Sequence, residues 1–253
     1  MLRGDDALTC SLLVDQWRNA EPRAREPEIL MAAEEPARYG EMVPLLERGR
    51  SRFDFRLVDN PFELEENLRG HVITEGATVR LVASFARPWK TRDAADPHQL
   101  APEMLDFCFR VGSGSRALTW ARPWNVVPDG DDYTAFIQAS PDSRMSSDPL
   151  AEVGCPYAVR GFDFDYVGLI WLQDLRWRSG HWQIFPQDTH ETGLQRTLAR
   201  ARTEGDPFGP HHTELLRRIQ QAYRILLTRA IKGLYVWCPD VETRNHLASC
   251  LGE

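Results

Sequence analysis

Residues 223–238 read YRILLTRAIKGLYVWC and join a helical half, a basic turn and an apolar half that is typical of a strand. Arg224, Arg229 and Lys232 fall within this stretch. An arginine fixed at the end of a buried element can stabilise the charge on a transferring phosphate, because its planar fork is always charged and binds phosphate oxygens bidentately. The alternative is an amphipathic helix whose surface basic residues suit the dipole near its C-terminus. Taken alone, the stretch favours this alternative.

The apolar spacing on either side of this stretch predicts alternating strands and helices. Asn60 and Pro61 provide a cap and a first helical residue, and we expect Gly70 to end that helix. A longer helix is predicted over residues 211–228 from its helical apolar spacing. Four apolar segments are typical of strands, namely 53–58, 79–85, 166–171 and 234–238. This order predicts an α/β fold with a mostly parallel sheet and helices on both faces.

Length and composition are those of a globular protein. The 253 residues allow one large domain, and we expect a single domain over residues 1–253. The formal net charge of −7 excludes a polyelectrolyte binder of nucleic acid for the whole chain, although residues 196–202 and 217–232 are rich in arginine and lysine. Five scattered cysteines, no signal peptide and no membrane-length apolar run predict a cytoplasmic protein with no membrane partner.

Residues 87–150 are the least regular part of the sequence, and we expect an irregular, insertion-like region there. Trp89 and Trp124 stand beside prolines and basic residues, in ARPWK and ARPWN. Such tryptophans can stack on the bases of single-stranded nucleic acid, or they can cover a small hydrophobic cluster. Other predicted elements are a strand over 134–139, a hairpin around Ser179-Gly180, a short helix over 194–202 and a last helix capped by Asp240.

Asp163 and Asp165 form a DxD pair just before the apolar run 166–171. Such a pair can hold a divalent metal, which makes a metal-dependent nuclease one hypothesis. No histidine or third carboxylate lies near the pair in sequence, so we predict no metal site. The expected role of Asp165 is structural, as a cap of the turn into the following strand.

Three segments resemble helicase motifs. VGCPYAVRGFDFDYVGLI, over residues 153–170, resembles motif V of superfamily 1 helicases, in which a turn ending in Gln-Gly-x-Glu-Phe-Asp precedes a buried strand. YRILLTRAIKG, over residues 223–233, resembles motif VI, and LLVDQWR, over residues 12–18, resembles motif IV. Together they are similar to the Schlafen group 3-type DNA/RNA helicase domain family over roughly residues 8–238.

The resemblance implies a RecA-like domain of the P-loop NTPase type, the second of the two domains of a helicase motor, with ATP and Mg in the cleft between the two. Arg229 and Arg18 resemble the arginines that reach the γ-phosphate. Asp163 stands where the family has a glutamate near the ribose, and Gly161 permits the close turn of motif V. The other implied candidates are Gln16, Arg224 and Lys232 at the nucleotide site and Arg160, Trp89 and Trp124 for nucleic acid.

The sequence departs from the family pattern mainly in lacking the motifs that bind the phosphates of ATP. The 253 residues contain no GxxxxGK[ST] loop and no acidic pair of a metal-holding strand. Arg160 and Asp163 replace the usual glutamine and glutamate of motif V. Met1 lies only a few residues before motif IV. We therefore expect either an excised half or a natural half-motor whose other half is a separate chain.

Two main hypotheses follow. In the first, the chain is half of a motor and is inactive alone. It supplies arginines to the ATP site of a P-loop-bearing partner and binds DNA or RNA. In the second, it is a non-catalytic RecA-like scaffold for nucleic acid or protein partners. The first hypothesis predicts that Gly161, Asp163, Arg18 and Arg229 lie on one edge of the sheet, and open α/β sheets usually bind ligands beyond the carboxyl ends of their strands.

Overall fold

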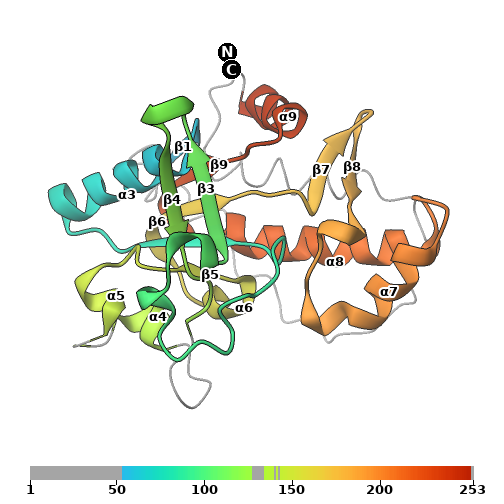
Figure 1. Ribbon diagram of the computed structural model, residues 1–253. Helices are drawn as coiled ribbons and strands as arrows, with labels where there is room; N and C mark the ends of the chain where they lie inside the picture. Colours follow the sequence, from blue (N-terminus) through green and yellow to red (C-terminus); the bar gives the residue numbers. More distant parts are fainter. Residues whose placement is uncertain (1–52, 127–133, 140, 142, 252–253) are drawn as a thin grey trace, which may run out of the picture.

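The computed structural model of the chain describes residues 53–126, 134–139, 141 and 143–251. A central sheet of five parallel strands has the order β1-β9-β6-β2-β5 (Figure 1). These strands are β1 (Asp54–Val58), β9 (Ala230–Trp237), β6 (Phe164–Ile170), β2 (Val79–Ala83) and β5 (Val153–Gly154). The four strands predicted from the sequence are thus confirmed as parallel neighbours, and the two-residue β5 is an addition.

The other elements connect and cover these strands. Two antiparallel hairpins lie outside the central sheet, β3 (Phe107–Val111) with β4 (Leu118–Arg122) and β7 (Leu175–Arg178) with β8 (His181–Ile184). The helices are α3 (Pro61–Glu75), α4 (Thr134–Gln138), α5 (Arg144–Ser147), α6 (Pro156–Val159), α7 (Gln195–Thr203), α8 (Pro210–Leu227) and α9 (Val241–Leu251). Short 3-10 helices occur at Pro97–Gln99, Pro102–Met104, Gly114–Arg116, Pro186–Asp188 and Thr192–Leu194. None of the described helices is long and apolar enough to span a membrane.

Helices lie on both faces of the sheet. Successive side chains of a strand point to opposite faces. Tyr166 of β6 stacks on His71 of α3, whereas Trp171, an odd number of residues later, contacts the ring of Tyr223 of α8. Helices α3 and α8 therefore cover opposite faces. This mostly parallel sheet between helices is the α/β arrangement of RecA-like domains, and the chain has it without a P-loop of its own.

Helix α3 is longer than predicted. It continues through Gly70 to Glu75, and Gly76 ends it with a left-handed φ of 62°. A glycine inside a helix costs about 1 kcal/mol relative to alanine. Leu64 and Leu68 are fully buried on the sheet side of the helix, and this packing outweighs the cost at Gly70.

Residues 134–138 form helix α4, so the strand predicted there is wrong. Phe136 packs over β5, where a Cβ on Gly154 would lie 2.4 Å from the phenyl ring. The buried guanidinium of Arg80 donates hydrogen bonds to the carbonyl oxygens of Phe136 (2.6 Å) and Ile137 (2.8 Å). The last carbonyls of a helix need such donors. A contact with β2 therefore stabilises α4, and local alternation does not reveal it.

Three other predicted elements are confirmed. The β7–β8 turn lies at Ser179 and Gly180, both with positive φ. Helix α7 is one residue away at each end from the predicted 194–202. Asp240 caps α9 by accepting a hydrogen bond from the backbone N–H of Thr243 at 3.0 Å.

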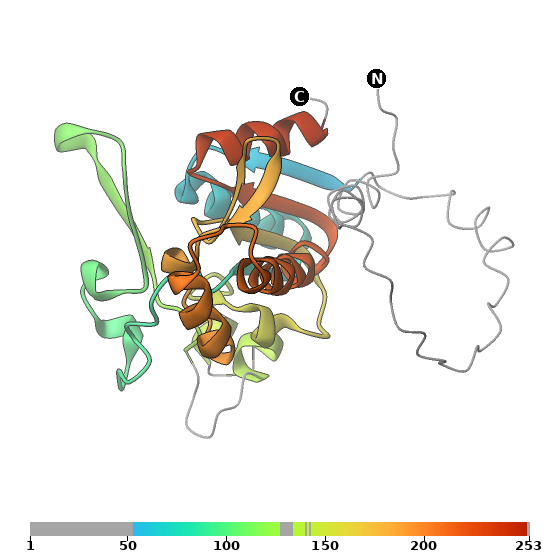
Figure 2. The ribbon, with the colours of Figure 1, turned by 90° about the vertical axis from the view of Figure 1, so that its right-hand side faces the viewer.

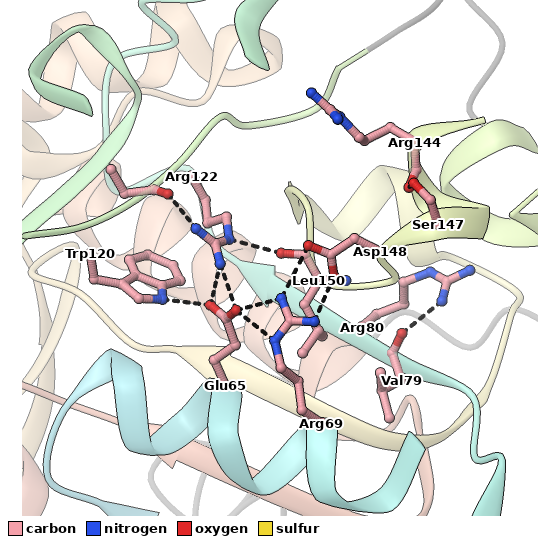
Figure 3. Close-up of polar contacts among 11 residues, drawn as sticks. Glu65, Arg69, Val79, Arg80, Trp120, Arg122, Arg144, Ser147, Asp148 and Leu150 are labelled. Atoms are coloured by element: carbon pink, nitrogen blue, oxygen red, sulfur yellow. Dashed lines mark hydrogen bonds and ion pairs between the residues drawn. The ribbon is translucent and has the colours of Figure 1, made fainter. Parts of the chain in front are cut away.

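The irregular region is joined to α3 through one buried carboxylate. The β3–β4 ribbon projects from the body of the molecule in Figure 2. At its base Glu65, which is 8% exposed, accepts a hydrogen bond from Trp120 Nε1 at 2.7 Å (Figure 3). Glu65 also pairs with Arg122 and Arg69, both at 2.6 Å, and Arg69 pairs with Asp148 at 3.0 Å. The ribbon, α3 and the end of α5 thus share one set of ion pairs.

Candidate functional site

Segments that precede two neighbouring strands meet at one edge of the sheet. Gly161 and Asp163 come before β6, and Arg229 comes directly before β9. The backbone N–H of Phe164 donates to the carbonyl oxygen of Arg229 at 2.9 Å, which joins the two segments. Gly161 has a φ of 88° and turns the chain into β6. The common edge predicted for Gly161, Asp163 and Arg229 is therefore present.

This edge lies at the amino ends of the parallel strands, not at the carboxyl ends where open α/β sheets usually bind ligands. The physical reason is the order of the chain, since both turns run into a strand instead of out of one. Arg18 and Gln16 fall outside the described residues.

The guanidinium of Arg229 is oriented by the end of α8. Its Nε donates to the carbonyl oxygen of Ile225 at 3.1 Å, and one terminal nitrogen donates to Thr228 Oγ1 at 3.1 Å. The other terminal nitrogen lies 3.0 Å from Asp163 Oδ1. The Arg229 side chain is 20% exposed and that of Asp163 is 55% exposed. Such a solvent-screened pair contributes only about 0–1 kcal/mol, so Asp163 is a replaceable partner.

Lys232 and Asp165 form a second pair on the same edge. Lys232 Nζ lies 3.0 Å from Asp165 Oδ1 and 3.6 Å from Glu75 Oε2. Asp165 Oδ2 also accepts hydrogen bonds from the backbone N–H (2.8 Å) and the hydroxyl (3.0 Å) of Thr78. The Thr78 amide, followed by Lys232, lowers the pKa of Asp165. Asp165 has a structural role, but it does not cap a turn as predicted. It is the second residue of β6, and its carboxylate ties the start of this strand to the residue before β2.

His71 of α3 connects this edge to β1. Its Nδ1 lies 2.6 Å from Glu75 Oε1 and its Nε2 lies 2.6 Å from the hydroxyl of Tyr235. Tyr235 donates its own proton to Asp54 Oδ2 at 2.6 Å. The hydrogen bond from His71 lowers the pKa of Glu75, which therefore accepts as a carboxylate. Both ring nitrogens of His71 thus lie within hydrogen-bond distance of an oxygen, one from Glu75 and one from Tyr235.

The sequence did not identify this histidine. The predicted helix ended before it, and its tyrosine partner is 164 residues away in sequence. The only local signal is the spacing of His71 and Glu75, which places them on one face of a longer helix.

Of the remaining residues predicted for the site, the two arginines lie on the surface and the two tryptophans are buried or partly buried. Arg160 is exposed beside Gly161, and Arg224 is exposed on the last turn of α8. Trp124 is 0% exposed and its ring centroid lies 4.7 Å from that of Phe85. A base-stacking role for Trp124 is therefore contradicted, and the hydrophobic-cluster alternative is correct for it. Trp89 is partly buried against the same cluster, 6.3 Å from Trp124.

A different polar cluster lies at the carboxyl ends of β2 and β6. Tyr223 of α8 donates its hydroxyl proton to Asp174 Oδ1 at 2.7 Å and accepts one from Ser84 Oγ at 3.1 Å. Asp174 is completely buried, and this burial raises the pKa of its carboxyl group to about 6. Its Oδ2 has no hydrogen-bond partner among the described residues. The side chain of Tyr223 thus serves this cluster and not the edge of Arg229.

The acidic side chains of the DxD pair contact different cations, Asp163 with Arg229 and Asp165 with Lys232. Within the part of the chain that the structure describes, no group of three or more histidine, cysteine, aspartate and glutamate side chains could hold a metal ion.

Comparison with known proteins gives one match. The family model described as Schlafen group 3, DNA/RNA helicase domain, matches residues 24–240. This range includes Gly161, Asp163, Arg224, Arg229 and Lys232, and it excludes Arg18. No curated protein and no solved structure gives a significant match to the chain.

Proposed function

Because the chain belongs to the Schlafen group 3, DNA/RNA helicase domain family, we propose that it acts as the second RecA-like domain of a superfamily 1 helicase-like NTPase. In this role it supplies arginine to the ATP site of a P-loop-bearing RecA-like partner domain, and it binds DNA or RNA. The chain has no phosphate loop, so the partner holds most of the nucleotide.

One observation carries the proposal: Arg229 is held in a fixed orientation and faces an exchangeable anion. Helix α8 fixes the guanidinium through Ile225 and Thr228. Its anionic partner, Asp163, is more than half exposed. A phosphate oxygen can replace the Asp163 carboxylate, because arginine forms charge-assisted hydrogen bonds with both.

The residues of this edge fit the phosphate part of Mg-ATP and not the metal. Arg229 and Lys232 are donors, while Asp163 and Asp165 are already paired with cations. ATP with Mg, held by the partner, supplies the phosphoryl group and part of the charge neutralisation. Arg229 binds oxygens of the γ-phosphate and stabilises the charge that develops there. An arginine supplied in trans contributes on the order of 10³–10⁵ in rate.

The test is an ATPase assay with a partner. The chain serves as bait for proteins that carry a GxxxxGK[ST] loop, and hydrolysis by the purified pair is measured. We expect the chain alone to be inactive, the pair to hydrolyse ATP, and Arg229→Ala to lower that rate at least about 10³-fold. Arg110→Ala, on the distant β3–β4 ribbon, is the matched control. Helicase-like turnover by the isolated chain would contradict the proposal.

A non-catalytic scaffold is the second candidate. The observation that favours it is the replacement of the family glutamine and glutamate by Arg160 and Asp163. Asp163 also forms an ion pair with Arg229, the arginine that would otherwise face the phosphate. A complex that forms normally and whose ATPase rate is unchanged by Arg18→Ala combined with Arg229→Ala supports the scaffold.

A further inference from the structure

Helices α7 and α8 concentrate positive charge in an acidic chain. Residues 195–229 contain seven arginines and three acidic residues, whereas the whole chain has a net charge of −7. Six of these arginines are exposed on the two helices, and one of them, Arg202, donates hydrogen bonds to the carbonyl oxygens of Pro186 and Thr189. We call the other five the arginine face. They are Arg196 and Arg200 on α7 and Arg217, Arg218 and Arg224 on α8.

Two of the three acidic residues are engaged by the backbone of the α7–α8 loop. Glu204 accepts a hydrogen bond from the backbone N–H of His212 at 2.9 Å, and Asp206 accepts one from Phe208 at 2.8 Å. These carboxylates stabilise the loop and the start of α8. They therefore leave the exposed sides of the two helices without neutralising charge.

The third acidic residue is shared between two arginines. Glu214 lies 3.2 Å from Arg217 and 2.8 Å from Arg218. The side chains of Arg196, Arg200 and Arg224 have neither a hydrogen bond nor an ion pair with any described residue. The arginine face therefore keeps a net positive charge and has free guanidinium donors.

The arginine face is elongated along the axis of α8. Arg217, Gln221 and Arg224 follow one another at helical spacing and form one stripe along α8, with the two arginines about 10 Å apart along the axis. All three are hydrogen-bond donors. Beside the stripe, a groove of about 520 Å³ lies between the start of α7 and the middle of α8, and Arg196 and Arg218 line it from the two helices. Figure 1 shows α7 next to α8.

We propose that the arginine face binds the phosphate backbone of single-stranded DNA or RNA. Sites for such strands usually combine a positively charged groove with aromatic side chains on which bases stack. Phe208, in the loop before α8, is 67% exposed and its ring lies 5.3 Å from that of His181. Membership of a DNA/RNA helicase domain family favours nucleic acid over an acidic protein as the ligand. The choice of ligand rests on the proposed function, but the contact does not involve Arg229.

The test is the salt dependence of binding, without ATP or partner. Fluorescence anisotropy gives the affinity of the chain for labelled oligo(dT) and oligo(U) of about 20 nucleotides, from about 50 to about 200 mM salt. Each lost phosphate contact lowers the slope of log affinity against log salt by about 0.7 for single strands. We expect Arg217→Ala combined with Arg224→Ala to lower the slope by about 1.4, and Arg217→Lys with Arg224→Lys to preserve it.

The matched control removes two exposed arginines of the β3–β4 ribbon, Arg110→Ala with Arg116→Ala, and should keep the wild-type slope. Thermal unfolding of each variant checks that the fold is intact. No binding by the wild-type chain, an unchanged slope in the α8 variant, or an equal loss in the ribbon variant would overturn the inference. Polyglutamate serves as a competing acidic polymer. An α8 variant that loses affinity for polyglutamate but keeps its affinity for the oligonucleotides would also overturn the inference. If the oligonucleotide test fails but Arg229→Ala lowers the partner ATPase rate as expected, only the inference about the arginine face is overturned. If the oligonucleotide test succeeds but Arg229→Ala leaves the ATPase rate unchanged, only the proposed function is overturned.

Discussion

At the scale of single residues, Asp174 is a carboxyl group whose burial changes its acidity from that in water. Its carboxyl group is completely buried, and among the described residues only Oδ1 accepts hydrogen bonds, from the Tyr223 hydroxyl and the backbone N–H of Leu175. Burial disfavours the charged form and raises its pKa from 3.8 to about 6. The folded chain therefore binds a proton here more tightly than the unfolded chain does.

We predict that Asp174 makes stability depend on pH. Because its folded pKa lies above its unfolded pKa, its contribution is most favourable at about pH 4 and is lost as the pH rises through about 6. The unfolding free energy of the wild type, relative to Asp174→Asn, should fall by about 2 kcal/mol between about pH 4 and pH 7. Urea titrations at several pH values measure this difference.

The exposed Asp93→Asn variant provides the comparison, since removal of that carboxylate leaves the core unchanged. It should follow the wild type across the same pH range. A difference between wild type and Asp174→Asn that stays constant with pH would rule out this account of the buried carboxyl group.

Sequence patterns identify residues whose role depends on a local motif. Gly161, Asp163 and Arg229 stand directly before strands, and two neighbouring parallel strands bring such positions to the same edge. His71 and Asp174 were not found, because their partners come from distant segments: Tyr235 for the first, Tyr223 and Ser84 for the second. Burial and long-range pairing have no signature in a single sequence.

At the scale of elements, Glu65 decides how the β3–β4 ribbon is attached. One carboxylate accepts hydrogen bonds from Trp120 and Arg122 of β4 and from Arg69 of its own helix. Trp120 and Arg122 are largely withdrawn from water, whereas the Arg69 side chain is 40% exposed. Removing a buried anion leaves its cationic partners without compensation, and this costs more than the pair itself contributes.

We therefore predict that Glu65→Ala lowers the free energy of unfolding by about 3–5 kcal/mol. Glu66→Ala removes the next, exposed glutamate of α3 and should change it by less than about 0.5 kcal/mol. Urea denaturation followed by tryptophan fluorescence measures both. An equal, small effect of the two substitutions would show that the ion pairs in Figure 3 do not hold the ribbon.

The elements themselves were predictable to different degrees. Three strands followed from apolar runs because their predicted segments are buried on both faces, as in β2, where every residue is buried. The edge strand β1 followed from alternation of apolar and polar residues, and its Arg56 is exposed. The end of α3 was misplaced because packing of Leu64 and Leu68 outweighs a local glycine. The helix α4 was missed because its terminal carbonyls are satisfied by Arg80, a residue of a different element.

At the scale of the whole molecule, the last strand in sequence lies inside the sheet. Strand β9 pairs with β1 on one side and with β6 on the other. The sequence predicted these strands as neighbours but not their order, since strand order depends on contacts between remote segments. The Asp163–Arg229 edge forms only when β9 is in place.

This order predicts that a chain truncated after Arg229 does not fold cooperatively. Without β9, β1 has no neighbour among the described strands and β6 keeps only β2. Truncation after Pro239 removes α9 and its cap Asp240, and should retain one cooperative urea transition, measured by far-ultraviolet circular dichroism. A normal transition in the shorter chain would show that β1 and β9 are dispensable for the core.

Helix α8 joins the arginine face to the sheet edge without a loop. It runs unbroken from Pro210 to Leu227, and Arg229 follows two residues later, anchored to the carbonyl oxygen of Ile225. An uninterrupted helix of this length is about 27 Å long and behaves as a stiff rod. The helix therefore sets the distance between the arginine face and the guanidinium of Arg229, with no loop in between to change it.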